Sequence, residues 1–336
     1  MWSRWRRKIA WRGLRALRRA GTRFRSPAVG KALFRLGHFA ERPVNLAHMG
    51  DYKLERFPPS GPLPWLDEPD AESRIDRKLA SGALTAREAE AFRHWTRSGY
   101  FVLERFFDPK RLDRVWEAYD RAARGGGIKL QPEPNRNPAD PHPSRSLDAH
   151  FAIPDLAALL EDPSLHRWVQ RLFGREPVAY QTLVSHKGSE QREHSDAIHM
   201  TTYPLGYLAA AWIAFEDIHP DCGPVVYYPG SHRLPYLSSL SLGISSDEFR
   251  RRGYDVYFER YEPAIQSLIA ERGLVPETFL PRKGDVLVWH ANLIHAGSPR
   301  RDLALSRKAA VLHYFVRGAV CYHDLAGELV PVERLF

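Results

Sequence analysis

Three residues of this sequence have the types and spacing of metal ligands. His194 and Asp196 stand two positions apart, and alternate side chains of an extended segment share a face, so an imidazole and a carboxylate can point at one place. His295 follows about a hundred residues later in a second apolar segment. Two imidazoles and one carboxylate occupy one face of an octahedral metal ion and leave the opposite face open, which is the arrangement of non-haem Fe(II) oxygenases.

Each of these residues also has a structural alternative. His194 and Asp196 could be an exposed loop pair, and His295 competes with His290, which we expect to pack in the sheet or to hydrogen-bond nearby. His199 and His232 could support the ligands from outside or be merely structural, and we favour a structural role for both. A zinc hydrolase ranks low, because the sequence has no His-Glu-x-x-His motif and no cysteine-rich site.

The basic character of the chain is concentrated at its N-terminus. Of 49 Lys and Arg residues, twelve fall within residues 1–36, which contain no Asp or Glu. The other 300 residues carry 37 basic and 40 acidic side chains, so the body is slightly acidic and a nucleic-acid-binding body is not indicated. The hydrophobic fraction of 43% is ample for a large core.

Residues 1–25 have the pattern of a basic, imperfectly amphipathic helix. Trp2, Trp5 and Ile9 fall in one sector of the helical wheel, and most of the arginines lie elsewhere. Such a helix can lie on an anionic membrane surface, which would place a cytoplasmic protein at the membrane periphery. A solvated basic tail and an organellar transit peptide are the alternatives.

The cysteine content and the hydrophobic pattern indicate the compartment of the protein and its relation to membranes. The two cysteines, Cys222 and Cys321, do not make a disulfide framework in a chain of this size and favour a reducing compartment. No window approaches 18 continuous apolar residues, so we expect no membrane span. The N-terminus also lacks the apolar core of a secretory signal, and we expect no export through it.

Beyond a basic N-terminal segment over 1–42 and an irregular linker over 43–80, we expect one domain over 81–336. Its first part is helical: Thr85 begins a helix through a capping box, Asp108 precedes a second one, and further helices are expected from Leu156 to Phe173, divided at Asp162-Pro163.

Short apolar, β-branched or aromatic runs follow, as is typical of strands. Five are predicted: Val178–Ser185, Tyr207–Phe215, Pro224–Tyr228, Asp285–Trp289 and Ala309–Phe315. A helical insertion over 246–273 separates the third run from the fourth. Helices followed by dense strands predict a single α+β domain whose sheet closes into a jelly-roll, cupin-like barrel. The glycine- and proline-rich stretch 125–146 should hold no regular element, and is either a mobile cover of the site or a surface excursion.

Longer motifs surround the three candidate ligands. They are His194-x-Asp196, Ala211–Asp217, Tyr228–His232 and the segment from His295 to Arg307. Through them the sequence, from about Leu84 to Tyr314, resembles the phytanoyl-CoA dioxygenase family of Fe(II)- and 2-oxoglutarate-dependent oxygenases. The resemblance implies a double-stranded β-helix that uses Fe(II), 2-oxoglutarate and O2 to hydroxylate an organic substrate, with release of succinate and CO2. The basic N-terminal segment indicates separately that the substrate could be a lipid.

The resemblance also implies individual roles. The iron ligands would be His194, Asp196 and His295, and Arg307 would bind the distal carboxylate of 2-oxoglutarate. Arginine suits that task because its planar fork grips both carboxylate oxygens, although Arg307 could instead be a surface residue. We expect three more residues to contact the cosubstrate or line its cavity: Gln181, Trp212 and Ser298.

Asp196 also favours one chemistry over another. Halogenating relatives of this family have a small residue at the carboxylate position, so that halide can bind, and a carboxylate there favours hydroxylation or a related oxidation. The alternative outside enzymes is a cupin-like metal- or ligand-binding protein that keeps the barrel without turnover.

Overall fold

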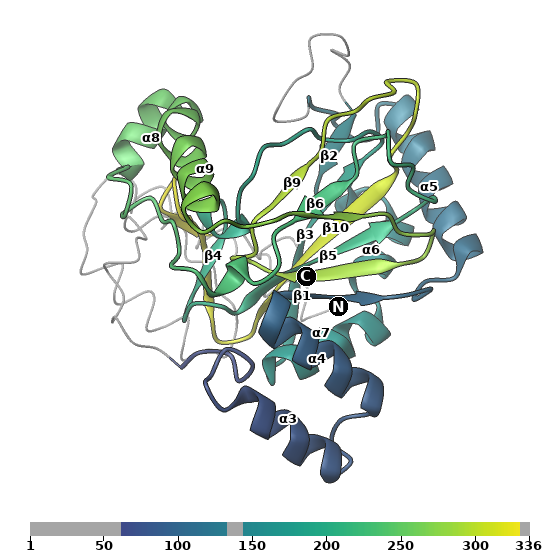
Figure 1. Ribbon diagram of the computed structural model, residues 1–336. Helices are drawn as coiled ribbons and strands as arrows, with labels where there is room; N and C mark the ends of the chain where they lie inside the picture. Colours follow the sequence, from purple (N-terminus) through teal and green to yellow (C-terminus); the bar gives the residue numbers. More distant parts are fainter. Residues whose placement is uncertain (1–61, 133–143, 330–336) are drawn as a thin grey trace, which may run out of the picture.

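The computed structural model describes residues 62–132 and 144–329 (Figure 1). The basic N-terminal segment, with its membrane and targeting alternatives, lies outside the described residues, and its role stays a prediction. Half of the predicted cover, residues 133–143, also lies outside the described residues. Within the described ranges, no helix has the length and apolar character needed to cross a bilayer.

Among the described residues, five α-helices come before the long strands: α3 Ala71–Ala80, α4 Ala86–Ser98, α5 Pro109–Arg124, α6 Pro154–Leu160 and α7 Pro163–Phe173. The predicted starts are confirmed. Thr85 and Glu88 form the reciprocal capping box of α4, and the carboxylates of Asp108 and Asp162 accept backbone N–H bonds at the starts of α5 and α7. The irregular linker predicted over 43–80 is wrong for its last ten residues, because α3 buries Ile75 there.

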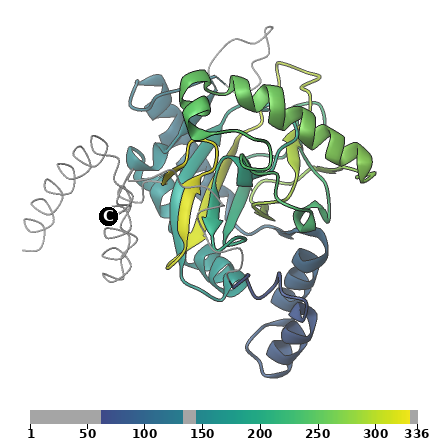
Figure 2. The same cartoon turned by 90° about the vertical axis from the view of Figure 1, so that its left-hand side faces the viewer.

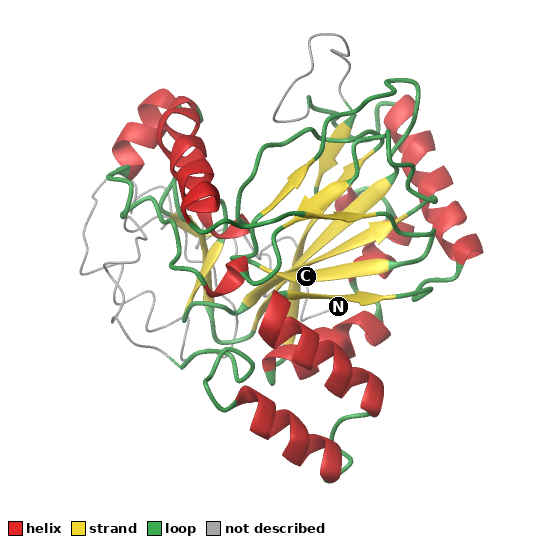
Figure 3. Cartoon of the chain, in the orientation of Figure 1, coloured by secondary structure: helices red, strands yellow, loops and turns green. Residues whose placement is uncertain are grey.

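The largest sheet is antiparallel and has the strand order β1-β8-β5-β10-β3-β2. Its strands are β1 Tyr100–Leu103, β2 Arg145–Leu147, β3 Pro177–Ser185, β5 Leu208–Ala214, β8 Val286–His290 and β10 Ala309–Val316. β2 corrects the expectation that 125–146 holds no element, since Arg145 begins a strand beside Ser185. Helices cover one face of this sheet, and strands gather at the centre of the molecule (Figure 3).

The other face of the large sheet packs against a second sheet of three strands. These are β7 Glu277–Phe279, β6 Val225–Tyr227 and β9 His295–Gly297, in the order β7-β6-β9. Trp212 of the large sheet meets Phe279 of the small one with 5.8 Å between ring centroids, inside a shared apolar cluster. Two facing antiparallel sheets with helices outside make the predicted barrel. A third sheet, β12-β11-β4, joins Glu328–Leu329, Val320–His323 and Thr201–Tyr203.

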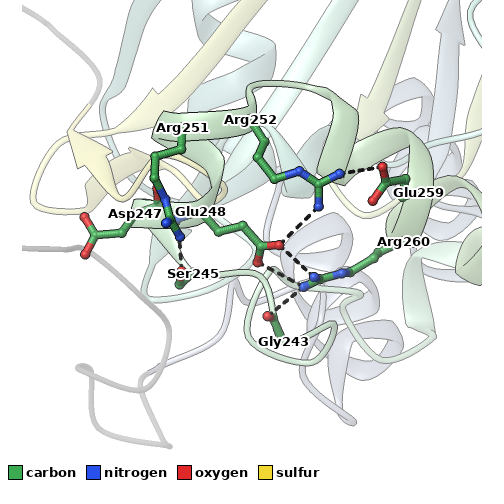
Figure 4. Close-up of polar contacts among 8 residues, drawn as sticks. All are labelled: Gly243, Ser245, Asp247, Glu248, Arg251, Arg252, Glu259 and Arg260. Atoms are coloured by element: carbon green, nitrogen blue, oxygen red, sulfur yellow. Dashed lines mark hydrogen bonds and ion pairs between the residues drawn. The ribbon is translucent and has the colours of Figure 1, made fainter.

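The predicted insertion is helical and lies apart from α5 (Figures 1 and 2). It consists of α8 Ser246–Arg252, a π-helix at Tyr257–Tyr261 and α9 Glu262–Glu271. A polar network ties its parts together (Figure 4): the Glu248 carboxylate accepts bonds of 2.7 and 3.1 Å from Arg260, which also donates to the Gly243 carbonyl at 2.9 Å. α8 and the π-helix are therefore held as one unit.

Candidate active site

The three predicted ligands come together in the structure. His194 and His295 face each other in an isolated antiparallel bridge, in which each backbone N–H donates to the other residue's carbonyl at 3.0 and 2.9 Å. Asp196 begins a short 3-10 turn directly after, and its Oδ1 lies 3.6 Å from His295 Nε2. One ligand atom from each of the three lies within 4.8 Å of the others, and all three side chains are buried. The exposed-loop alternative is therefore wrong.

Backbone carbonyls set the orientation of both imidazoles. Nδ1 of His194 lies 2.8 Å from the Arg192 carbonyl, and Nδ1 of His295 lies 2.9 Å from the Leu293 carbonyl. A carbonyl can only accept, so each Nδ1 carries the proton and each Nε2 keeps its lone pair. This is the usual way in which a metal-binding histidine is fixed.

The carboxylate of Asp196 is held by one oxygen. The Trp289 indole N–H donates to Asp196 Oδ2 at 2.7 Å, which leaves Oδ1 on the side of His295. Burial alone would raise the pKa of Asp196, but the surrounding imidazoles, His295 foremost, and the Trp289 bond lower it overall. Burial also lowers the pKa of His194 to about 3. A neutral imidazole and an ionised carboxylate are the states that metal binding requires.

The donor set fits iron(II). Two imidazole nitrogens and one carboxylate oxygen, with no thiolate among them, are the ligands of the facial triad. His290 is not part of this set, as predicted: its Nδ1 accepts the Asn292 N–H at 2.9 Å. The cysteines are also absent from it, and Cys222 and Cys321 are both buried and free.

A cavity of about 530 Å³ surrounds the three ligands. Arg307 lines it and is only 4% exposed, so the surface alternative for this residue is wrong. Its Nη1 donates to the Gly223 carbonyl at 2.8 Å. Gly223 has a φ of +80°, and a Cβ there would lie 2.7 Å from Arg300 Cγ, so the close approach of this loop requires glycine.

Of the other three predicted site residues, two line the cavity and one does not. Gln181 on β3 and Trp212 on β5 line the cavity, as predicted. Ser298 does not line it: its hydroxyl donates to the Pro224 carbonyl at 2.8 Å, and the residue faces a neighbouring hollow. The expectation that its hydroxyl reaches the cosubstrate has no support in this geometry, because the Ser298 backbone N–H also donates to the Pro224 carbonyl, at 2.9 Å, and holds the residue beside the start of β6.

Sequence reasoning missed two residues that touch the ligand group. One is Trp289, for which the sequence carries no signal beyond its place in an apolar strand. The other is His313 on β10, which lines the cavity with its Nε2 3.9 Å from Asp196 Oδ2 and stands opposite Gln181 in the β10–β3 register. The period of two along a strand offered a signal for it, because Val311 and His313 lie two positions apart on β10 and both line the cavity.

Trp289→Phe should weaken metal binding while leaving the fold intact. It removes the indole N–H that holds Asp196, and losing an outer hydrogen bond of this kind costs about 10- to 100-fold in metal affinity. Calorimetric titration with Co(II) measures the effect. Trp168→Phe is the control, since that ring packs on Phe92 and Phe101 away from the cavity. Equal Co(II) affinity in all three proteins would refute the role of Trp289.

The fold and the site together define a double-stranded β-helix protein with a His-Asp-His metal-binding group. Residues 95–309, well over half of the chain, match the model of the phytanoyl-CoA dioxygenase (PhyH) family, and the chain belongs to that family. The predicted resemblance is thereby confirmed. Iron(II) and 2-oxoglutarate are the cofactors that this family and this donor set imply.

Individual relatives are more distant. The phytanoyl-CoA dioxygenase domain-containing protein 1 of Mus musculus is 28% identical over 193 residues, which are 56% of this chain and 60% of the mouse protein. The chain thus spans less than two thirds of that relative. The ectoine dioxygenase of Halomonas elongata is 24% identical over 254 residues, covering 70% of this chain and 71% of the relative.

Solved structures show the same fold. The non-heme alpha ketoglutarate dependent carbocyclase SnoK from nogalamycin biosynthesis superimposes with a TM-score of 0.54 at 19% identity, covering 73% of this chain and 88% of SnoK. EctD from S. alaskensis with 2-oxoglutarate and 5-hydroxyectoine gives a TM-score of 0.50 at 21% identity, covering 72% and 79%. The double-stranded β-helix predicted from the sequence is confirmed.

Proposed function

We propose that this protein is an Fe(II)- and 2-oxoglutarate-dependent dioxygenase that hydroxylates a small organic or lipid substrate. One observation carries the proposal: His194, Asp196 and His295 converge in the same buried cavity that Arg307 lines. When bound there, iron with 2-oxoglutarate and O2 supplies the oxidation, which inserts one oxygen atom into a substrate C–H bond and releases succinate and CO2.

The residues of the chain supply binding, orientation and exclusion of water. Nε2 of each histidine and Oδ1 of Asp196 would hold the metal. Arg307, buried and fixed by its bond to Gly223, would bind the distal carboxylate of 2-oxoglutarate, because a buried carboxylate needs a cation with matching geometry. The rings of Trp212 and Trp289 close the cavity on the side of the large sheet and keep it poor in water.

The organic nature of the substrate is supported by the cavity and by one relative. Leu147, Tyr254 and Phe258 give the cavity an apolar wall, which suits a carbon skeleton. Ectoine, the small molecule in the name of a relative, is of a size that such a cavity accepts. Hydroxylation is supported by Asp196, since a carboxylate at this position leaves no room for a halide. A cupin-like binding protein without turnover would not need the complete ligand set together with Arg307.

The test is turnover. The purified protein is incubated in air with Fe(II), 2-oxoglutarate and a pool of metabolites and lipids. Succinate is quantified, and mass spectrometry searches for products heavier by one oxygen atom. Succinate that requires Fe(II), together with an oxygenated product, is the expected result. A protein that binds Fe(II) and 2-oxoglutarate but forms no succinate would instead be the binding protein.

A further inference from the structure

Two side chains on the insertion side of the cavity carry buried polar atoms that have no hydrogen-bond partner among the described residues. They are the imidazole of His199, both of whose ring nitrogens are buried and unpartnered, and the hydroxyl of Tyr257, a residue only 3% exposed. Both side chains line the cavity, and their ring centroids are 5.2 Å apart. Buried polar groups normally have partners, so this pair requires an explanation.

Both side chains are held close to the metal-binding group. His199 follows directly on the 3-10 turn that begins at Asp196, and its ring centroid is 5.7 Å from that of His194. Tyr257 stacks on Tyr261 at 5.0 Å, and the Tyr261 hydroxyl accepts the Ser195 N–H at 2.9 Å. The insertion is therefore anchored on the ligand-bearing segment itself.

The local backbone also sets this pair apart. Tyr257 begins the π-helix, a rare conformation that is found most often at functional sites. The Glu248–Arg260 network holds that π-helix against α8 (Figure 4). The Tyr257 ring is buried and stacked on Tyr261, so its unsatisfied hydroxyl faces the cavity region and not solvent.

The chemistry of the two groups defines their ligand. Burial raises the pKa of the Tyr257 phenol, so its hydroxyl keeps its proton at neutral pH, and neither ring nitrogen of His199 has a carboxylate within hydrogen-bonding distance. A neutral imidazole has one donor and one acceptor, and a phenol can do either. The carboxylate of Glu262, which lines the same wall, is occupied by Arg192 at 3.2 Å. The ligand group that matches these two side chains donates and accepts hydrogen bonds and carries no charge.

We propose that His199 and Tyr257 form the site that binds an alcohol or amide group of the substrate and thereby turns a neighbouring C–H bond towards the metal-binding group. The proposal rests on the oxygenase function proposed above. It adds the class of polar group that the substrate carries and the residues that bind this group. Tyr254 and Phe258 of the same insertion contact the carbon skeleton beside that group.

The first experiment compares two hydroxyl deletions in the same π-helix. Tyr257→Phe removes an unpartnered hydroxyl, so the Tm of the ligand-free protein should equal or exceed that of wild type. Tyr261→Phe removes a hydroxyl that is bonded to Ser195, and its Tm should fall by about 2 °C or more. A fall in Tyr257→Phe as large as in Tyr261→Phe would overturn the proposal, because it would show that the Tyr257 hydroxyl has a structural partner.

The second experiment measures substrate use in Tyr257→Phe and His199→Phe. A metabolite extract is titrated into each protein with Fe(II) and 2-oxoglutarate, and the rise in succinate release is followed. Both variants should need about tenfold more extract for half-maximal stimulation, since each loses one hydrogen bond to the substrate. The rise in Tm caused by Co(II) should match wild type, because neither residue is a metal ligand. The compound that wild type consumes should contain an alcohol or amide.

The outcomes separate this proposal from the oxygenase function. Three results would each overturn the assignment of His199 and Tyr257: both variants need no more extract than wild type for half-maximal stimulation, the consumed compound contains neither an alcohol nor an amide, or the variants lose the rise in Tm with Co(II). In each case, succinate release by the wild-type protein would still support the oxygenase function. An absence of succinate from wild type would overturn the oxygenase function itself.

Discussion

Asp196→Ala should reduce succinate release from 2-oxoglutarate to below about one hundredth of the wild-type rate. Outer-sphere partners of a metal ligand are each worth about 10- to 100-fold in affinity or activity, so the ligand itself is worth at least as much. The substitution removes the carboxylate of the set and leaves two imidazoles, so the facial triad of ligands for Fe(II) is incomplete. The rate is measured as succinate formed at saturating 2-oxoglutarate and Fe(II).

A loss of activity alone would not identify a ligand, so metal binding is measured beside it. Co(II) titration should show binding to wild type and weak or no binding to Asp196→Ala. Asp155→Ala is the matched control, because that carboxylate is exposed on α6. Its turnover and Co(II) affinity should equal those of wild type. Turnover by Asp196→Ala at the wild-type rate would remove Asp196 from the ligand set.

Local signals were enough to predict most elements of this fold. Thr85 and Glu88 define a helix start within four residues, and Asp108 and Asp162 do the same through one side chain and a following proline. The strands carry short apolar runs between glycine and proline, and β3, β5 and β10 lie within a residue or two of the ranges expected. Such signals depend on neighbours in the chain, which a sequence displays directly.

The features that could not be predicted depend on contacts between segments that are distant in the sequence. Helix α3 is an exception, because Ala71, Ile75 and Leu79 recur at steps of four, and this helical signal was included in the predicted linker. Trp289 reaches Asp196 across 93 positions, and nothing in either segment announces that hydrogen bond. Ser298 was expected at the cosubstrate from its place in the sequence, but its backbone N–H and its hydroxyl both donate to the Pro224 carbonyl. The metal ligands were predictable because their chemistry restricts residue type, whereas the supporting contacts accept many types.

Arg307→Ala should raise the KM for 2-oxoglutarate by about a hundredfold or more and change kcat less. Removing one partner of a buried ion pair costs about 3–5 kcal/mol, because the other charge stays buried without compensation. In wild type the buried guanidinium, fixed by the Gly223 carbonyl, would meet the distal carboxylate of 2-oxoglutarate. The KM follows from succinate release at increasing 2-oxoglutarate, and the rise in Tm with 2-oxoglutarate and Co(II) reports binding independently.

Two further variants test which property of Arg307 matters. One separates its charge from its planar geometry, and the other compares it with an arginine at the surface. Arg307→Lys keeps the charge but loses the planar fork, so its KM should lie between those of wild type and Arg307→Ala. Arg301→Ala removes a side chain that is 80% exposed in the same loop and should leave the KM unchanged. Because Arg307 lies at the cavity and Arg301 at the surface, equal KM values for the two alanine variants would mean that the distal carboxylate is bound elsewhere in the cavity.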